Sequence, residues 1–174
     1  MKKPLFVLLA LLSASTVPPD VVGARPVMTA QGSATATLTV HAHVVRNCTI
    51  TATPVDFGNY DPLVANAVQP LDATGGMAIT CTKGINPTVE LDDGANAQGA
   101  VRRMSSGTSF LTYELYLDVG RTIVWGAGAD AAALTLNPGT IGGSYNAVAF
   151  ARVPGGQNVA PGDYDDTVTA TVIF

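Results

Sequence analysis

The stretch Ala34-Thr-Ala-Thr-Leu-Thr-Val-His-Ala-His-Val-Val45 decides how the rest of the chain is interpreted. Small or branched apolar side chains fill every second position, namely Ala34, Ala36, Leu38, Val40, Ala42 and Val44. Threonines, His41 and His43 fill the positions between them. Alternation with period 2 is typical of a β-strand with one buried face. The stretch therefore predicts a strand longer than the usual 5–6 residues or so.

The composition of the whole chain agrees with a β protein. The chain has 174 residues with 13% charged residues, about half the ~25% usual for soluble domains. About seven or eight short strands, separated by turn residues at regular spacing, indicate a β-sandwich. Low charge and scarce Lys and Glu exclude a coiled coil, and the apolar content excludes a disordered chain. A formal net charge of −4 argues against nucleic acid as a partner.

Two details of this interpretation concern turns. Thr74-Gly75-Gly76 predicts a turn between strands, since paired glycines often mark one. Residues 95–109 are polar and Gly-rich, and we expect a connection there that carries the basic pair Arg102 and Arg103. Residues 164–174 alternate again and predict the last strand.

The N-terminus resembles an export signal. Lys2 and Lys3 precede a nine-residue apolar run, which is too short for the ~20 residues of a membrane helix. We expect cleavage after Ala24, with Ala30 as an alternative site and a buried N-terminal helix as the competing interpretation. The expected organisation is therefore a signal peptide at 1–24, an arm at 25–47 and one domain at 48–174. Such a protein passes through the periplasm to the cell surface or is secreted.

Export would place the two cysteines in an oxidising compartment. Cys48 and Cys81 allow one intramolecular pairing, although two free thiols or a metal-binding pair remain alternatives.

Residues that could support catalysis are sparse. His41 and His43 would point to the same side of a strand, yet no third metal ligand is near them in sequence, so polar residues on an exposed face are the simpler interpretation. The chain has no Gly-x-Ser-x-Gly motif and no phosphate loop ending in Lys. Trp125 is expected in the core or at an edge rather than as a sugar platform. We expect no catalytic site, no metal and no cofactor.

Several motifs taken together resemble a known family. They are Cys48-Thr49-Ile50, residues 56–62 (DFGNYDP), residues 79–84 (ITCTKG), Arg103-Met104, residues 111–118 (LTYELYLD), Trp125-Gly126 and the terminal run from Gly162 to Phe174. Their order and spacing are similar to the spore coat protein U domain, a family that includes the pilins of archaic chaperone–usher pili. The resemblance covers residues 34–174.

The resemblance implies an incomplete immunoglobulin-like sandwich that is completed by a donor strand from a partner. A periplasmic chaperone lends the strand first, an outer-membrane usher assembles the subunits, and the arm of a neighbouring pilin replaces the chaperone. In this family Cys48 and Cys81 would form the disulfide. The terminal strand, with Tyr164, Val168, Ala170, Val172 and Phe174, would border the groove that accepts the donor strand.

The residues of the arm support this hypothesis independently. Its alternating apolar side chains could fill a groove on a neighbour, with register set by the side chains. The alternative is that residues 34–45 pair within their own sheet. We therefore predict a structural pilin subunit for fibres that serve adhesion and biofilm formation, and not an enzyme. A binding module such as a tip adhesin, or a coat-structure protein, is the alternative.

Overall fold

A computed structural model describes residues 32–127, 134–135 and 143–174. The protein is all-β: in these residues every regular element is a strand, so none is a helix that could cross a membrane. Contacts divide the chain after His41 into two units. In the first unit, residues 32–41 have no secondary structure and fully exposed side chains. The second unit is the folded domain.

The domain contains nine strands in the described residues. In chain order they are β1 (Cys48–Thr53), β2 (Leu71–Cys81), β3 (Thr88–Leu91), β4 (Arg103–Ser106), β5 (Ser109–Thr112), β6 (Glu114–Tyr116), β7 (Leu134–Thr135), β8 (Ser144–Val153) and β9 (Ala170–Ile173).

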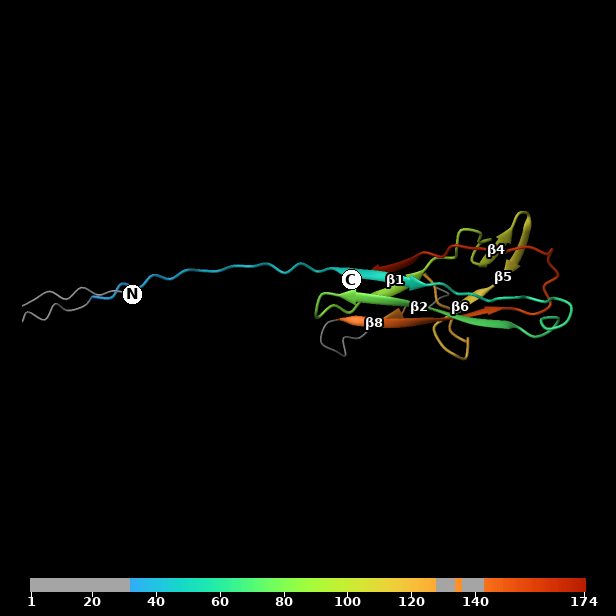
Figure 1. Ribbon diagram of the computed structural model, residues 1–174, viewed down its shortest axis with the longest axis horizontal. Helices are drawn as coiled ribbons and strands as arrows, with labels where there is room; N and C mark the ends of the chain where they lie inside the picture. Colours follow the sequence, from blue (N-terminus) through green and yellow to red (C-terminus); the bar gives the residue numbers. More distant parts are fainter. Residues whose placement is uncertain (1–31, 128–133, 136–142) are drawn as a thin grey trace, which may run out of the picture. The chain divides into compact units, whose positions relative to one another are not determined.

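One sheet has the order β1-β2-β8-β6 (Figure 1). Its centre is the long antiparallel pair of β2 and β8, which runs from Leu71 opposite Val153 to Thr80 opposite Ser144. β1 pairs with the second half of β2, with Cys48 opposite Cys81. The other edge of β1 has no strand partner among the described residues, so β1 is an edge strand of this sheet.

The second sheet has the order β7-β3-β9, and β4 and β5 form a separate hairpin. β9 is also an edge strand: Ala170 pairs with Leu91 and Ile173 with Thr88, while the opposite side of β9 carries no ladder in the described part of the chain. The strands β1 in the first sheet and β9 in the second thus each have one side without a ladder in the described residues.

The core is formed chiefly by the inward side chains of β2 and β8. Ile79, Ala151 and Val153 are fully buried, as are Val89 on β3 and Trp125. The indole Nε1 of Trp125 donates a hydrogen bond of 2.9 Å to the Val89 carbonyl. Trp125 is therefore a core residue that joins the loop after β6 to the second sheet.

Three sequence predictions differ from this structure. Residues 34–45 form no strand, because no strand among the described residues pairs with them. Gly75 and Gly76 lie inside β2 rather than in a turn; a side chain at Gly75 would collide with Val55 and the Thr53 carbonyl, so glycine there permits the close approach of the segment after β1. The predicted connection at 95–109 contains β4, which pairs with β5 in a hairpin that extends to Thr112.

The last strand is also shorter than the sequence indicated. Regular pairing covers only Ala170–Ile173, whereas residues 164–169 are extended with one isolated bridge, between Ser105 and Asp165. Side-chain alternation persists throughout this segment, since even-numbered residues from 164 to 172 are half-buried and odd-numbered ones are exposed.

Candidate strand-acceptor groove

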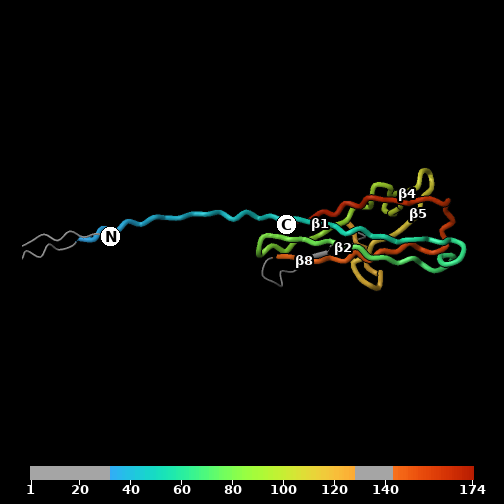
Figure 2. Tube along the Cα trace, viewed as in Figure 1, coloured from blue at the N-terminus to red at the C-terminus, as the bar shows by residue number. Residues whose placement is uncertain are grey.

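The two unpaired edges border a common apolar groove. One wall is formed by residues 52–57, at the end of β1 and just after it, and the other by residues 164–170. Core side chains form its floor: Met77, Leu91, Met104, Tyr113, Leu115 and Ala149. The cavity volume is about 350 Å³. Figure 2 shows the chain after residue 160 following the same side of the domain as the segment that begins with β1.

The groove widens at one end into a second cavity of about 990 Å³. Residues 54–60 and 159–165 line this wider mouth, and Met104 and Tyr164 line both cavities. Two polar contacts hold its rim. The Tyr60 hydroxyl accepts a hydrogen bond of 2.9 Å from the Gln157 backbone N–H, and the Gln157 side chain bonds both the backbone and the hydroxyl of Thr112.

The side chains at the groove walls are less buried than those on the floor. Val55, Phe57, Val168 and Ala170 all touch the core but remain half-exposed. Half-buried apolar side chains beside unpaired backbone edges are a hazard for aggregation unless something covers them. The groove therefore has the chemistry to accept an additional β-strand with small apolar side chains.

The residues predicted for the terminal strand are distributed along this wall. Tyr164, Val168 and Ala170 line the groove. Val172 packs against the core without lining the groove, and Phe174 lies beyond the end of β9 with 45% of its surface exposed.

The predicted donor residues in the arm have exposed side chains. Leu38, Val40 and Val44 expose 77–86% of their surface. Neither these residues nor His41 and His43 belong to a strand or a metal-ligand cluster in the part of the chain that the structure describes. An apolar stripe of this kind remains available to a partner.

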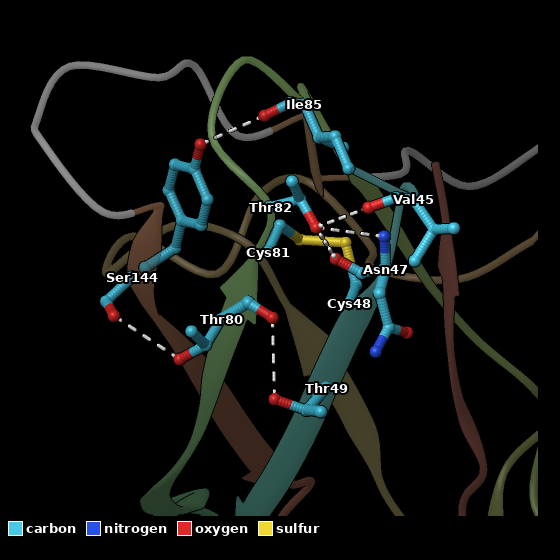
Figure 3. The surroundings of a disulfide bond; sticks show 10 residues. Val45, Asn47, Cys48, Thr49, Thr80, Cys81, Thr82, Ile85 and Ser144 are labelled. Atoms are coloured by element: carbon cyan, nitrogen blue, oxygen red, sulfur yellow. Dashed lines mark hydrogen bonds between the residues drawn. A yellow bond between two sulfur atoms is a disulfide. The ribbon is translucent and has the colours of Figure 1, made fainter. Parts of the chain in front are cut away.

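A disulfide joins Cys48 to Cys81 and fixes β1 to β2 where the arm leaves the domain (Figure 3). Thr82 reinforces this attachment, because its Oγ1 accepts from the Asn47 N–H and lies within hydrogen-bond distance of the Val45 and Asn47 carbonyls. The Thr82 N–H also donates to the Asn47 carbonyl at 2.8 Å. The wall formed by β1 is thereby held in place although its outer edge is unpaired.

A buried arginine holds the opposite wall, a role that the sequence did not reveal. Arg102 is 2% exposed; it forms an ion pair with Glu114 and donates to the Asp92 carbonyl through Nε and Nη2. The cation is thus paired and hydrogen-bonded, as a buried charge requires. Its carbonyl accepts from the Tyr113 N–H, so Arg102 connects the hairpin to the groove floor. The sequence offered only an Arg-Arg pair in a polar stretch.

Asp166 is the one groove-lining carboxylate with several internal partners. It accepts hydrogen bonds from the Tyr113 hydroxyl at 2.7 Å and from the backbone and side chain of Asn96. Burial, and then the bond to Asp166, raise the pKa of Tyr113 far above its usual value, so the phenol stays protonated. This network fixes the terminal segment above the groove floor.

The backbone N–H of Thr169 donates to Asp92, farther along the same wall. Partial burial tends to raise the pKa of Asp92, but the bonds from Thr169 and Gly94 outweigh it and lower that pKa below its usual value. Asp92 therefore remains ionised and holds the end of β3 to the terminal segment.

The fold and the groove together define an immunoglobulin-like β-sandwich with an apolar groove between two open edges. The sequence matches the spore coat protein U domain over residues 34–171, and the chain belongs to this family. The match begins at Ala34, so the family pattern includes the alternating arm as well as the domain.

Two known proteins are similar to this chain over most of its length or most of its domain. Protein U of Myxococcus xanthus is 35% identical over 156 residues, covering 82% of this chain and 86% of that protein. A crystal structure of the CsuC–CsuE chaperone–tip adhesion subunit pre-assembly complex, from archaic chaperone–usher Csu pili of Acinetobacter baumannii, contains a chain with 28% identity and a TM-score of 0.54. The match covers 75% of this chain and 40% of that one.

A third similarity is to a structure of a chaperone–usher pilus, with 17% identity and a TM-score of 0.46, covering 92% of this chain and 99% of that one.

Proposed function

We propose that this protein is a structural pilin subunit that polymerises by donor-strand exchange into surface fibres. The observation that carries the proposal is the pairing of complementary features in one chain. The domain has an apolar groove between two unpaired strand edges, and the arm has an exposed stripe of alternating apolar side chains. Addition of a strand to a sheet edge supplies main-chain hydrogen bonds for affinity and side-chain pockets for specificity.

The arm would act between molecules. Six apolar side chains, Ala34 to Val44 at every second position, would enter the groove of a second copy and cover its half-exposed walls. Burying a side chain such as Leu38 or Val40 contributes roughly 1.5–3 kcal/mol. Tyr164, Val168, Ala170, Val172 and Phe174 would form the neighbouring strand, and the Cys48–Cys81 disulfide would resist pulling on the arm where it joins the domain.

The open groove also defines the other partners. A periplasmic chaperone would cover the edges during export and an outer-membrane usher would assemble the subunits, as in the pathway of the structural relative. Residues 1–24 would act as the signal peptide and residues 25–47 as the donor arm, leaving the domain at 48–174. The fibre would lie at the cell surface and serve adhesion and biofilm formation, with no catalytic step and no cofactor.

Deletion of the arm tests the proposal. The full chain and a variant lacking residues 31–44 are purified from periplasm in complex with the chaperone. Each complex is then incubated so that the arm of one subunit can displace the chaperone from another. We expect the full chain to form multimers that dissociate on boiling, and the variant to remain bound to chaperone one-to-one.

A pair of arm variants provides the matched control. L38D/V40D places charges on the apolar stripe and should abolish multimers, whereas T37D/T39D places them on the other face and should leave assembly largely intact. A full chain that is a stable monomer without chaperone would contradict the proposal and favour a binding module.

A further inference from the structure

The polar face of the arm carries two histidines, His41 and His43. Residues 32–47 contain no acidic residue, and their only ionisable side chains are His41, His43 and Arg46. The two histidines are exposed and belong to the row that alternates with the apolar stripe. Both lie in the last third of the arm, near the domain.

The wide mouth of the groove carries negative charge. Asp56, Asp163 and Asp165 line it and are exposed, and no Lys, Arg or His lines either cavity. Among the described residues these three carboxylates form no salt bridge. Arg103, on the hairpin strand beside Asp165, is occupied by bonds to the Asn96 carbonyl and the Gln98 side chain.

The parity of the two segments determines which side chains would meet. The stretch 34–44 and the terminal stretch 164–174 each contain eleven residues. The apolar side chains of the arm occupy even positions, and the half-buried side chains of the terminal stretch occupy even positions from 164 to 172. Directly opposed residues of two paired strands point to the same face of the sheet. An arm whose apolar stripe faces the groove floor therefore places its odd-numbered row in line with Asp163, Asp165, Thr167 and the exposed residues that follow.

Strand direction decides whether the charges meet. An arm antiparallel to the terminal segment brings His43 and His41 to the level of Asp163, Asp165 and Thr167. A parallel arm would bring them instead to Thr171 and Ile173, where no carboxylate lies. On the other wall, the exposed row of β1 is Thr49, Thr51 and Thr53, which is uncharged.

We propose, building on the pilin function above, that His41 and His43 of one copy form an ionic row with Asp163 and Asp165 of the next copy. This ionic row favours the antiparallel arm. It also strengthens, at acidic pH, the contact between the arm of one subunit and the groove of the next, which we call the joint. The other charged groups near this row are Asp56 and Asp61 at the mouth, Arg46 on the arm and the occupied Arg103. Asp166 points inward and is occupied by Tyr113 and Asn96.

The direction of the pH effect follows from linkage. An imidazole that gains carboxylate neighbours holds its proton more tightly in the joint than in the free arm. This contribution is present at mildly acidic pH and is lost as pH rises through the range where histidine titrates. Partly exposed ion pairs of this kind change an equilibrium or rate by roughly two- to fivefold each.

The test measures dissociation of purified multimers of the full chain at pH 7.5 and pH 5.5, at constant ionic strength. We expect wild-type joints to dissociate roughly 2- to 20-fold more slowly at pH 5.5. The double variant H41N/H43N and the double variant D163N/D165N should each remove most of this difference. The control D93N neutralises an exposed carboxylate that lies outside the groove lining and should retain it.

A charge-swapped chain tests contact directly. H41D/H43D should weaken the joint at both pH values, and adding D163K/D165K to the same chain should restore it. If the pH difference persists in both neutralised variants, or the swap restores nothing, the ionic row is wrong although the pilin function stands. If wild type forms no multimers, both the ionic row and the pilin function are wrong.

Discussion

Two sides of this sandwich are built from the same alternating pattern and end in different states. On the β2–β8 side, ten consecutive residue pairs are in register, and the inward side chains of residues 77–81 and 147–153 are at most 8% exposed. On the side between β1 and β9, the alternation is equally regular, but the inward side chains are only half-buried. The difference is the presence of a partner strand. β2 and β8 pair with each other along their length, whereas no strand among the described residues pairs with the outer sides of β1 and β9.

This comparison shows that binary pattern alone does not tell where a strand finds its partner. Alternation specifies which face is buried, and the partner can belong to the same chain or to another. The arm has such a pattern, but its stripe is exposed and it pairs with no strand in the part of the chain that the structure describes.

The largest expected effect is on the closed side. W125A should lower the free energy of unfolding by about 3–5 kcal/mol, because it empties a fully buried site and leaves the Val89 carbonyl without its donor. Urea denaturation of the purified chain measures it. W125F, which keeps most of the ring volume, should lose clearly less; equal losses would mean that the volume of the indole is unimportant.

Removal of the disulfide should come next. C48S/C81S is expected to cost about 3–4 kcal/mol of unfolding free energy, since the bond closes a loop with a sequence separation of 33 residues. Because the bond also holds the open edge strand β1 to the closed side, assembly should decline together with stability. Thermal unfolding with and without reductant checks this, and wild type insensitive to reductant would contradict it.

The same truncation of valine to alanine on each side compares the two sides directly. Val153 is fully buried in β8, whereas Val168 lies half-buried in the groove wall. V153A should cost about 2–3 kcal/mol in the isolated chain, and V168A less than about 1 kcal/mol. In assembled multimers the loss of unfolding free energy caused by V168A should be larger, because a donor strand in the groove would bury the Val168 side chain. An unchanged cost on assembly would show that the groove stays open.

The smallest effect concerns an ion pair on the closed side. A bidentate hydrogen bond from Arg152, at 2.7 and 2.8 Å, lowers the pKa of Asp72 below its usual 3.8. A carboxylate whose pKa is lower in the folded chain than in the unfolded chain stabilises the fold above about pH 4. This contribution is lost as pH falls through the lowered pKa. D72N should therefore be less stable than wild type by under about 1 kcal/mol at pH 7, since the pair is exposed.

The difference should shrink as pH falls through the lowered pKa of Asp72, because below it Asp72 is protonated in both folded and unfolded chains. Denaturation of wild type and D72N across this pH range measures it. A difference that persists in acid would mean that the amide perturbs packing rather than charge.

The sequence was most informative where chemistry is local. Alternation at residues 164–174 predicted the side-chain parity of the terminal segment, and the motifs from Cys48 to Gly162 indicated the family. The turn predicted at Gly75 and Gly76 is wrong, because paired glycines mark a turn as readily as a close approach of two backbones. Arg102 could not be found, because the partners that allow its burial come from residues ten and twelve positions away.

The sequence by itself therefore determined the β class, the side-chain parity of the terminal segment and the arm's apolar stripe, because side-chain periodicity is a local property of the chain. Only the tertiary structure decided that β1 and β9 would both be edges and border one groove. That arrangement depends on which strands far apart in the sequence pair, such as β2 with β8 and β3 with β9, a global choice set by packing the core around Trp125, Ile79 and Val153. No local pattern carries that information.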